Sequence, residues 1–189
     1  MPPKVKVLKE QIIEAALDVV REQGADALNA RAVAKKIGCS TQPVFSNYPS
    51  MDALRTAVIL EAKERYRQFI RDEMAEEEYP PYKASGMAYI RFAREETELF
   101  RLLFMRNRSQ EKITEERDEV AGLIRLISEK TGLDAEDAYL FHIEMWICVH
   151  GIATMIATSY LEWNEEQINR ILTDAYQGLR KQFCQKGGE

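Results

Sequence analysis

Apolar residues recur along the chain at intervals of three and four positions, which is the spacing of one face of an α-helix. No segment alternates apolar and polar residues as a half-buried strand would. The last such stripe begins after Asn164 and contains Ile168, Ile171, Leu172, Ala175, Leu179 and Phe183. The pattern predicts an all-α protein of about nine helices, with three small helices followed by larger ones.

Residues that start and end helices divide the amino-terminal part of the chain. Gly24 follows an apolar stripe over residues 7–23 and can take the left-handed conformation that closes a helix. Asn29 is the expected N-cap of a short helix over residues 30–37, and Gly38 ends it. These residues predict two helices separated by a short connection.

A third and a fourth helix are expected on either side of Pro49. Ser40 is the expected N-cap of a helix over residues 41–47. Pro43 would then be its third residue, where no intrahelical N–H bond is lost. Ser50 is the expected N-cap of a long fourth helix.

The remainder of the chain is predicted to contain longer helices. Pro81 suits the first turn of a helix, and Asp134 is an expected N-cap. The segment from Asn164 to Gln167 resembles a capping box. The predicted spans are one helix from Pro81, then 99–106, 111–130, Asp134 to Tyr160, and a last helix from Asn164.

The two short helices at 30–37 and 41–47 are joined by a turn that contains Gly38, as in a helix-turn-helix. The second one carries small polar side chains that can reach base edges in a DNA major groove. We therefore expect a DNA-binding domain at residues 1–52 and a helical domain for effector binding and dimerisation at residues 53–189.

Charge is distributed unevenly between these segments. The chain has a net charge of −5, yet residues 1–55 carry eight Lys and Arg against six Asp and Glu. The remainder carries 18 against 25, so a weakly basic head precedes an acidic body. Phosphate binding needs only one cationic face, so the acidic total does not exclude DNA as a partner.

Residues 12–54 resemble the DNA-binding head of TetR-family transcriptional repressors. The shared pattern consists of Ile12-x-x-Ala15-Ala16-Leu17, Gly24, Val33-Ala34-x-x-Ile37-Gly38, Phe45, Tyr48 and Leu54. The segment from Trp146 to Gly151 also resembles the Trp-x-x-x-His-Gly pattern in the body of one branch of that family.

The resemblance implies DNA contacts at Arg31, Thr41, Gln42, Pro43, Phe45 and Asn47. Lys6 and Ser40 are further candidate DNA-binding residues. Arg31 is expected to read a guanine edge, and Gln42 can pair with adenine through two hydrogen bonds. The ring of Pro43 suits a thymine methyl group.

Two positions depart from the family pattern. The family often has Tyr in place of Phe45 and usually has Lys in place of Met51, and both contact phosphate. Their loss is expected to weaken non-specific binding. Lys4, Lys6 and Lys9 are the candidates to replace these contacts.

For the body, the resemblance implies dimerisation and binding of a small molecule. A dimer through the last two helices is expected, with Gly151, Ala153 and Ala157 permitting close approach. The partners are then palindromic double-stranded operator DNA, a second copy of the chain, and a small apolar or amphipathic effector. Candidate effector-binding residues are Phe69, Phe104, His142, Trp146 and His150. By this interpretation, effector binding moves the fourth helix and releases a repressor from its operator.

Several classes of function and location are disfavoured. Three dispersed cysteines suit a reducing compartment, and no apolar run approaches the ~20 residues that span a bilayer, so a cytoplasmic protein without a membrane partner is expected. No cofactor or metal site is expected, because His142 and His150 lack a third ligand at usable spacing. No catalytic motif indicates an enzyme. An activator, a ligand-independent regulator and a protein-interaction module remain alternatives.

Overall fold

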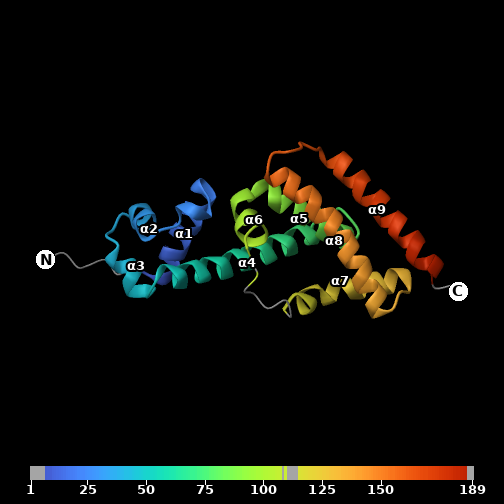
Figure 1. Ribbon diagram of the computed structural model, residues 1–189, viewed down its shortest axis with the longest axis horizontal. Coiled ribbons are helices and arrows are strands. Elements are labelled where there is room, and N and C mark those ends of the chain that lie inside the picture. The colour runs from blue at the N-terminus through green and yellow to red at the C-terminus, as the bar shows by residue number, and fades with distance from the viewer. Residues whose placement is uncertain (1–6, 108, 110–114, 187–189) are drawn as a thin grey trace. The chain divides into compact units, whose positions relative to one another are not determined.

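The computed structural model describes residues 7–107, 109 and 115–186, and over this part of the chain all regular elements are helical (Figure 1). The all-α prediction is therefore confirmed. The chain divides into two compact units. Unit 1 comprises Met1–Gln68 and Glu96–Arg106, and unit 2 comprises Phe69–Glu95 and Asn107–Glu189.

Unit 1 is built on α1, against which α2 and α6 pack. Its elements are α1 (Lys9–Gln23), the 3-10 turn η1 (Ala25–Ala27), α2 (Ala30–Ile37), α3 (Gln42–Asn47), α6 (Thr97–Phe104) and the first part of α4 (Met51–Ala75). Glu96, directly before α6, accepts hydrogen bonds from the Nε and Nη2 atoms of Arg21 at 2.8 and 2.7 Å. This bidentate pair fixes α6 on α1.

The ends of α1 and α2 follow the predicted glycine and asparagine signals. Gly24 ends α1 with a φ of +83°, which favours glycine, but its ψ of 167° lies outside the expected left-handed helical region. Its N–H donates to the Val20 carbonyl. The Asn29 side chain accepts hydrogen bonds from the N–H groups of Arg31 and Ala32, both at 3.0 Å. Gly38 is left-handed at φ +78° and ψ +34°. The predicted span of α2 is confirmed.

The predicted start of α3 is wrong by one residue. Helix α3 begins at Gln42, and its N-cap is Thr41, whose side chain makes no capping hydrogen bond. Ser40 is therefore not the cap, and Pro43 is the second helical residue. Pro43 is still tolerated, because the first turn contains N–H groups without helical partners. The Ser50 cap of α4 is confirmed by a 3.1 Å bond from the Ala53 N–H to its hydroxyl oxygen.

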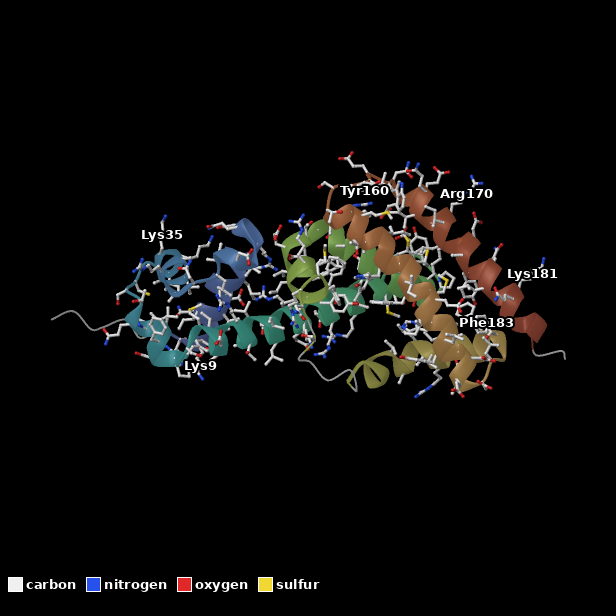
Figure 2. All side chains as sticks on the ribbon, in the orientation of Figure 1. Lys9, Lys35, Tyr160, Arg170, Lys181 and Phe183 are labelled. Atoms are coloured by element: carbon white, nitrogen blue, oxygen red, sulfur yellow. The ribbon has the colours of Figure 1, made fainter. Side chains whose placement is uncertain are left out.

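Unit 2 is centred on α8, which contacts α5, α7 and α9 (Figure 1). Its helices are α5 (Pro81–Glu95), α7 (Glu115–Thr131), α8 (Ala135–Ala157) and α9 (Glu165–Lys186), with the last part of α4. One buried cluster consists of Ile127, Ala138, Phe141, Met145 and Phe183. Phe183 lies on the side of α9 that faces this cluster (Figure 2).

Local caps again set the start of the longer helices. Asp134 accepts hydrogen bonds from the N–H groups of Glu136 and Asp137, at 3.0 and 2.9 Å. Asn164 and Gln167 form the predicted capping box through reciprocal bonds of 3.1 and 2.9 Å. Both N-caps are confirmed.

Two predicted helix boundaries in the rest of the chain differ from the structure, and a third cannot be compared. Helix α6 starts two residues earlier than expected, at Thr97, and α8 ends at Ala157, three residues earlier. Residues 111–114 of the predicted 111–130 helix lie outside the described residues.

Gly86 allows α5 to approach two neighbouring helices closely. A Cβ atom at this position would lie 3.3 Å from Cγ2 of Val149 on α8 and 3.8 Å from Cδ1 of Leu172 on α9. The first distance is tighter than almost all real Cβ contacts. Any side chain at position 86 would therefore push on α8.

One face of α8 is apolar but uncovered. Leu140, Trp146 and Ile147 are 46, 40 and 61% exposed. Ala153 and Ala157, expected to face a partner, are instead buried in the chain at 0 and 1% exposure, because they lie on the covered face. Only Gly151 of the three predicted small residues is not buried, and a Cβ there would meet open space.

By length and composition alone, α8 could also cross a membrane, contrary to the expectation from the sequence. A core helix of a protein outside the membrane passes the same test, so this observation is weak. The contacts of α8 with α5, α7 and α9 account for its apolar composition without a bilayer.

Candidate nucleic-acid interface

Helix α3 has one packed face and one open face. Val44 and Tyr48 are 1 and 9% exposed and fix the helix in unit 1, whereas Phe45 is 50% exposed. Gln42 and Ser46 are also exposed. The spacing of Gln42, Phe45 and Ser46 places these three side chains on one side of the helix, and we call them the open face of α3.

The side chains of the open face differ in their freedom to bind a ligand. The Ser46 hydroxyl donates to the Gln42 carbonyl at 2.9 Å, so it is tied to its own helix. The side-chain amide of Gln42 makes no hydrogen bond to any residue that the structure describes. Gln42 therefore offers a donor and an acceptor side by side, as an adenine edge requires.

Asn47 is partly committed inside the protein. Its amide nitrogen donates to the Pro43 carbonyl at 2.9 Å and to the Val7 carbonyl at 3.4 Å. The second bond ties the segment before α1 to α3. Of the other predicted contacts, Ser40 is exposed and Thr41 and Pro43 are half-buried, whereas Lys6 lies outside the described residues.

The cationic side chains of α2 differ in whether they form an ion pair with a carboxylate. Lys36 pairs with Glu22 of α1 at 2.5 Å, and this hydrogen bond raises the pKa of Lys36. Arg31 and Lys35 are exposed on α2 and form no ion pair within the described residues; Lys35 projects from its helix (Figure 2). These two charges remain available for phosphate or a guanine edge.

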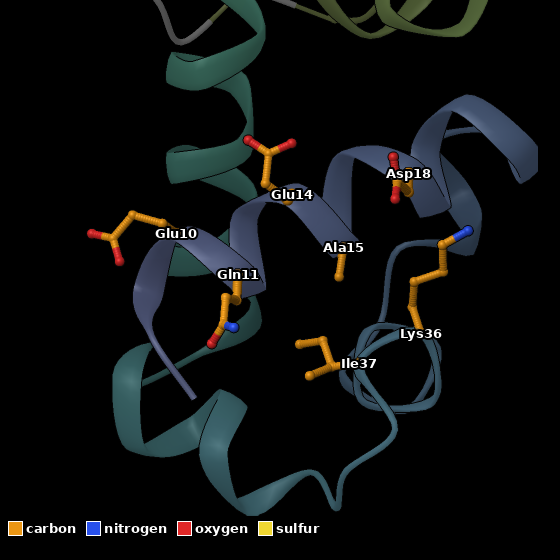
Figure 3. A pocket seen from close by; sticks show the side chains of 7 residues that line it. All are labelled: Glu10, Gln11, Glu14, Ala15, Asp18, Lys36 and Ile37. Carbon is orange, nitrogen blue, oxygen red and sulfur yellow. The ribbon is translucent and has the colours of Figure 1, made fainter. Parts of the chain in front are cut away.

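The opposite charge is concentrated on α1. Glu10, Glu14 and Asp18 lie one turn apart along this helix and line a shallow, open hollow of about 410 Å³, bounded by Lys36 and Ile37 (Figure 3). Phosphates are repelled by such a row of carboxylates. The charge pattern therefore favours approach of DNA to α2 and α3 rather than to this side of α1.

Lys9 and Met51 flank the helix-turn-helix. The Lys9 ammonium lies 5.7 Å from the centre of the Tyr48 ring, a cation–π contact. Tyr48 is therefore a packing residue that also positions a charge. Met51 is half-buried and begins α4, so no charge is present at this helix start apart from Asp52.

In unit 2, the two histidines pair with tyrosines of α5. The Tyr82 hydroxyl lies 3.2 Å from Nδ1 of His142, and the Tyr89 hydroxyl lies 2.9 Å from Nδ1 of His150. Burial lowers the pKa of both histidines. Neutral imidazoles are thus favoured, and each Nδ1 can accept a hydrogen bond from its tyrosine hydroxyl.

The remaining candidate effector-binding residues are not gathered at one place. Trp146 stacks on His150 with ring centres 4.8 Å apart. Phe69 makes an edge contact with Phe92 at 5.4 Å. Phe104 belongs to unit 1, where it contacts Tyr66 at 5.2 Å and Phe100 at 5.1 Å.

Two family models cover most of the chain. One, described as bacterial regulatory proteins of the tetR family, matches residues 12–58. The other, described as a tetracyclin repressor-like C-terminal domain, matches residues 82–178. The chain belongs to the TetR family. It is a TetR-family transcriptional regulator with a DNA-binding helix-turn-helix.

Solved structures share the TetR fold at low sequence identity. A TetR-family protein from Vibrio parahaemolyticus has a TM-score of 0.66 and 14% identity, covering 89% of this chain and 96% of its own. A TetR-like regulator from Rhodococcus sp. RHA1 has a TM-score of 0.59 and 18% identity over the whole of both chains. The multidrug-binding protein EbrR, complexed with imidazole, has a TM-score of 0.55 and 16% identity over 88% of both chains. No curated protein sequence matches.

TetR-family proteins bind operator DNA, dimerise and bind small molecules, and they are generally not enzymes and typically cytoplasmic. In this TetR-family chain, sequence reasoning missed Tyr82 and Tyr89 as histidine partners. Their spacing of seven on α5, beside the spacing of eight between His142 and His150, was the available signal.

Proposed function

We propose that this TetR-family protein is a sequence-specific homodimeric repressor that binds a palindromic operator and is released by a small apolar or amphipathic molecule. The open face of α3 is the observation that carries the proposal. It presents an uncommitted amide at Gln42 and a half-exposed ring at Phe45, with Arg31 unpaired among the described residues of α2.

The roles of these groups follow from their chemistry. The Arg31 guanidinium can donate two hydrogen bonds to the acceptors of guanine, and Gln42 can pair with adenine. Thr41, Pro43 and Phe45 add contacts at the same end of α3. Ser40 and the Oδ1 atom of Asn47 are available for backbone contacts. Lys6 is proposed to contact phosphate.

DNA binding can be measured by fluorescence anisotropy on palindromic sequences from the DNA that flanks the gene. We expect salt-dependent, sequence-selective binding that Arg31→Ala and Gln42→Ala each weaken by roughly 1–3 kcal/mol. Arg170→Ala is the matched control, because Arg170 is an 84% exposed arginine of unit 2. Binding without selectivity at low salt would contradict the proposal and favour a protein-interaction module.

The uncovered face of α8 supports a homodimer through the last two helices. Leu140, Trp146 and Ile147 form an apolar surface that the chain itself does not cover, and Gly151 leaves room beside them. Ile168, Leu172 and Phe183 of the apolar stripe of α9 are buried in their own chain, so α9 would contribute its polar face. In sedimentation experiments, Ile147→Glu should convert a dimer to a monomer, whereas Leu60→Glu, at a site also 61% exposed, should not.

Effector binding is proposed near the helix pair α5–α8. Aromatic groups with polar tips, namely the tyrosine–histidine pairs and Trp146, suit an amphipathic molecule. The binding of imidazole by EbrR shows that a protein of this fold can take a small heterocycle. Phe69 would extend this lining, and a role for Phe104 would require a contribution from unit 1.

Repression and release can be separated by measuring operator affinity with and without bound molecules. A molecule releases the repressor only if it binds the DNA-free state more tightly. We expect affinity for the operator to fall when an effector binds. Equal operator affinity with several true ligands of unit 2 would favour a ligand-independent regulator, and transcription that rises with the protein would favour an activator. The protein is proposed to act in the cytoplasm and without catalysis.

A further inference from the structure

Arg91 of α5 binds three carboxylates that come from three different segments of unit 2. Its Nη1 donates to Glu73 of α4 at 2.6 Å, and its Nη2 donates to Glu78 at 2.7 Å. Its Nε donates to Glu165, the first residue of α9, at 2.8 Å. Each nitrogen thus serves a different segment, and we call these four residues the Arg91 clamp.

The clamp differs from the ordinary surface ion pairs of the chain. The Arg91 side chain is 20% exposed and Glu73 is 24% exposed, whereas Arg170 and Asp174 lie 3.8 Å apart at 84 and 70% exposure. Hydrogen bonds to the three carboxylates raise the pKa of Arg91. Glu78 and Glu165 are more exposed, at 48 and 45%, so the Arg91–Glu73 contact is the shielded one. Short contacts of a planar guanidinium with several carboxylates are geometrically specific, unlike single exposed pairs.

Glu73 is the member of the clamp that lies on α4. This helix is continuous from Met51, four residues after the end of α3, to Ala75. Its first turns are held in unit 1 by buried Leu54 and Val58. Its last turns belong to unit 2, where the Phe69 ring contacts Phe92 and Glu73 contacts Arg91, one residue apart on α5.

We propose that Arg91 is a positioning residue for DNA binding: by holding Glu73, it fixes the end of the helix that begins directly after α3, the proposed recognition helix. This inference rests on the proposed DNA-binding function. Because Arg91 also holds Glu165 and Glu78, the position of α4 is linked to the start of α9 and to the α4–α5 connection. A molecule that disturbs α5 or α9 would thereby alter α4.

The three carboxylates provide matched variants for a test. Glu73→Met, Glu78→Met and Glu165→Met each remove one negative charge and one acceptor from the same guanidinium. Arg91 keeps two carboxylates in every variant, and only Glu73→Met removes the ion pair between Arg91 and α4. The change in net charge is therefore the same in all three.

The experiment measures the operator Kd and amide hydrogen exchange for each full-length variant. For Glu73→Met we expect a Kd at least five-fold weaker, with an unchanged salt slope because no phosphate contact is lost, and at least ten-fold faster exchange in residues 69–75. Glu78→Met and Glu165→Met should stay within two-fold in Kd. Arg91→Lys should resemble Glu73→Met, because an ammonium cannot bridge three segments in the same way.

Two results would overturn the inference. One is a Glu73→Met protein that binds DNA within two-fold of the original chain. The other is an equal loss of affinity in all three carboxylate variants, which would indicate a general effect of charge or stability. If the unaltered chain binds no DNA, the proposed function fails, and unchanged exchange in residues 69–75 of Glu73→Met would show separately that the clamp does not hold α4.

Discussion

The two units of the chain use different kinds of contacts to place their functional groups. In unit 1, the short helices that carry Arg31, Gln42 and Phe45 contain bonds between residues two to four apart, such as those of Asn29 and Ser46. In unit 2, the tyrosine–histidine pairs and the Arg91 clamp join segments that lie up to 74 residues apart. The bonds that shape the DNA-reading helices are therefore local, whereas the groups proposed for regulation are brought together only in the folded body.

The largest contrast is expected between two phenylalanines, one from each unit. Phe141 is fully buried in the cluster of unit 2, while Phe45 is 50% exposed on α3. Phe141→Ala should lower the free energy of unfolding by about 3–5 kcal/mol, whereas Phe45→Ala should change it by less than about 0.5 kcal/mol. Urea denaturation followed by circular dichroism measures both. Similar losses would mean that Phe45 is a core residue and not a reading residue.

A smaller effect on stability is expected from the glycine that ends α2 in unit 1. Gly38 is left-handed and a Cβ there would meet no atom within 4 Å, so Gly38→Ala adds backbone strain without a clash. We expect a loss of about 1–2 kcal/mol in the free energy of unfolding. Gly122 on α7 also faces open space but is helical, so Gly122→Ala should stabilise the chain by about 0.5–1 kcal/mol. Loss of stability in both variants would point to packing instead of backbone strain.

Adding a positive charge at the start of α4 should change the salt dependence of DNA binding, whereas the same charge in unit 2 should not. Met51→Lys places a cation three residues after Tyr48, where relatives of the family usually have lysine. The slope of log Kd against log salt should become steeper by about one. Tyr160→Lys adds the same charge at a 74% exposed position of unit 2 and should leave the slope unchanged. Equal slopes for the two variants would place Met51 away from phosphate.

The smallest expected effect is a decrease in melting temperature at low pH, caused by the two histidines of unit 2. Burial lowers the pKa of His142 and His150 below 6.5, so the unfolded chain binds more protons as the pH falls through that value. The melting temperature should therefore decrease from pH 7.5 to pH 5. His142→Gln keeps an acceptor for the Tyr82 hydroxyl and removes one titrating group, so its melting temperature should decrease less over this range. An identical decrease in both proteins would exclude His142 as a source.

Caps explain why much of the helical order could be predicted. Asn29, Ser50 and Asp134 act on N–H groups within three residues, so their signals are complete in a short stretch of sequence. The prediction that Ser40 caps α3 was wrong for an equally local reason, since the helix starts one residue later, at Gln42.

Tertiary contacts explain most of what could not be predicted. Both faces of α8 are apolar, so periodicity could not tell which face the chain covers, and Ala153 and Ala157 were assigned to the wrong one. The pairing of Tyr82 with His142 depends on the packing of α5 on α8. The similar spacings of the tyrosines on α5 and of the histidines on α8 are compatible with this pairing, but neither helix alone identifies the partner.

Because Gly86 has no side chain, α5 lies close to α8 between the two tyrosine–histidine pairs, and both pairs depend on the separation of these helices. Gly86 lies between Tyr82 and Tyr89 on α5, and it touches Val149, the neighbour of His150. A shift of α8 by a few tenths of an ångström would therefore lengthen or shorten both hydroxyl–imidazole bonds together. In a nuclear magnetic resonance titration, the signals of the two imidazole rings would shift together. The two histidines would therefore report on any molecule that separates α5 from α8.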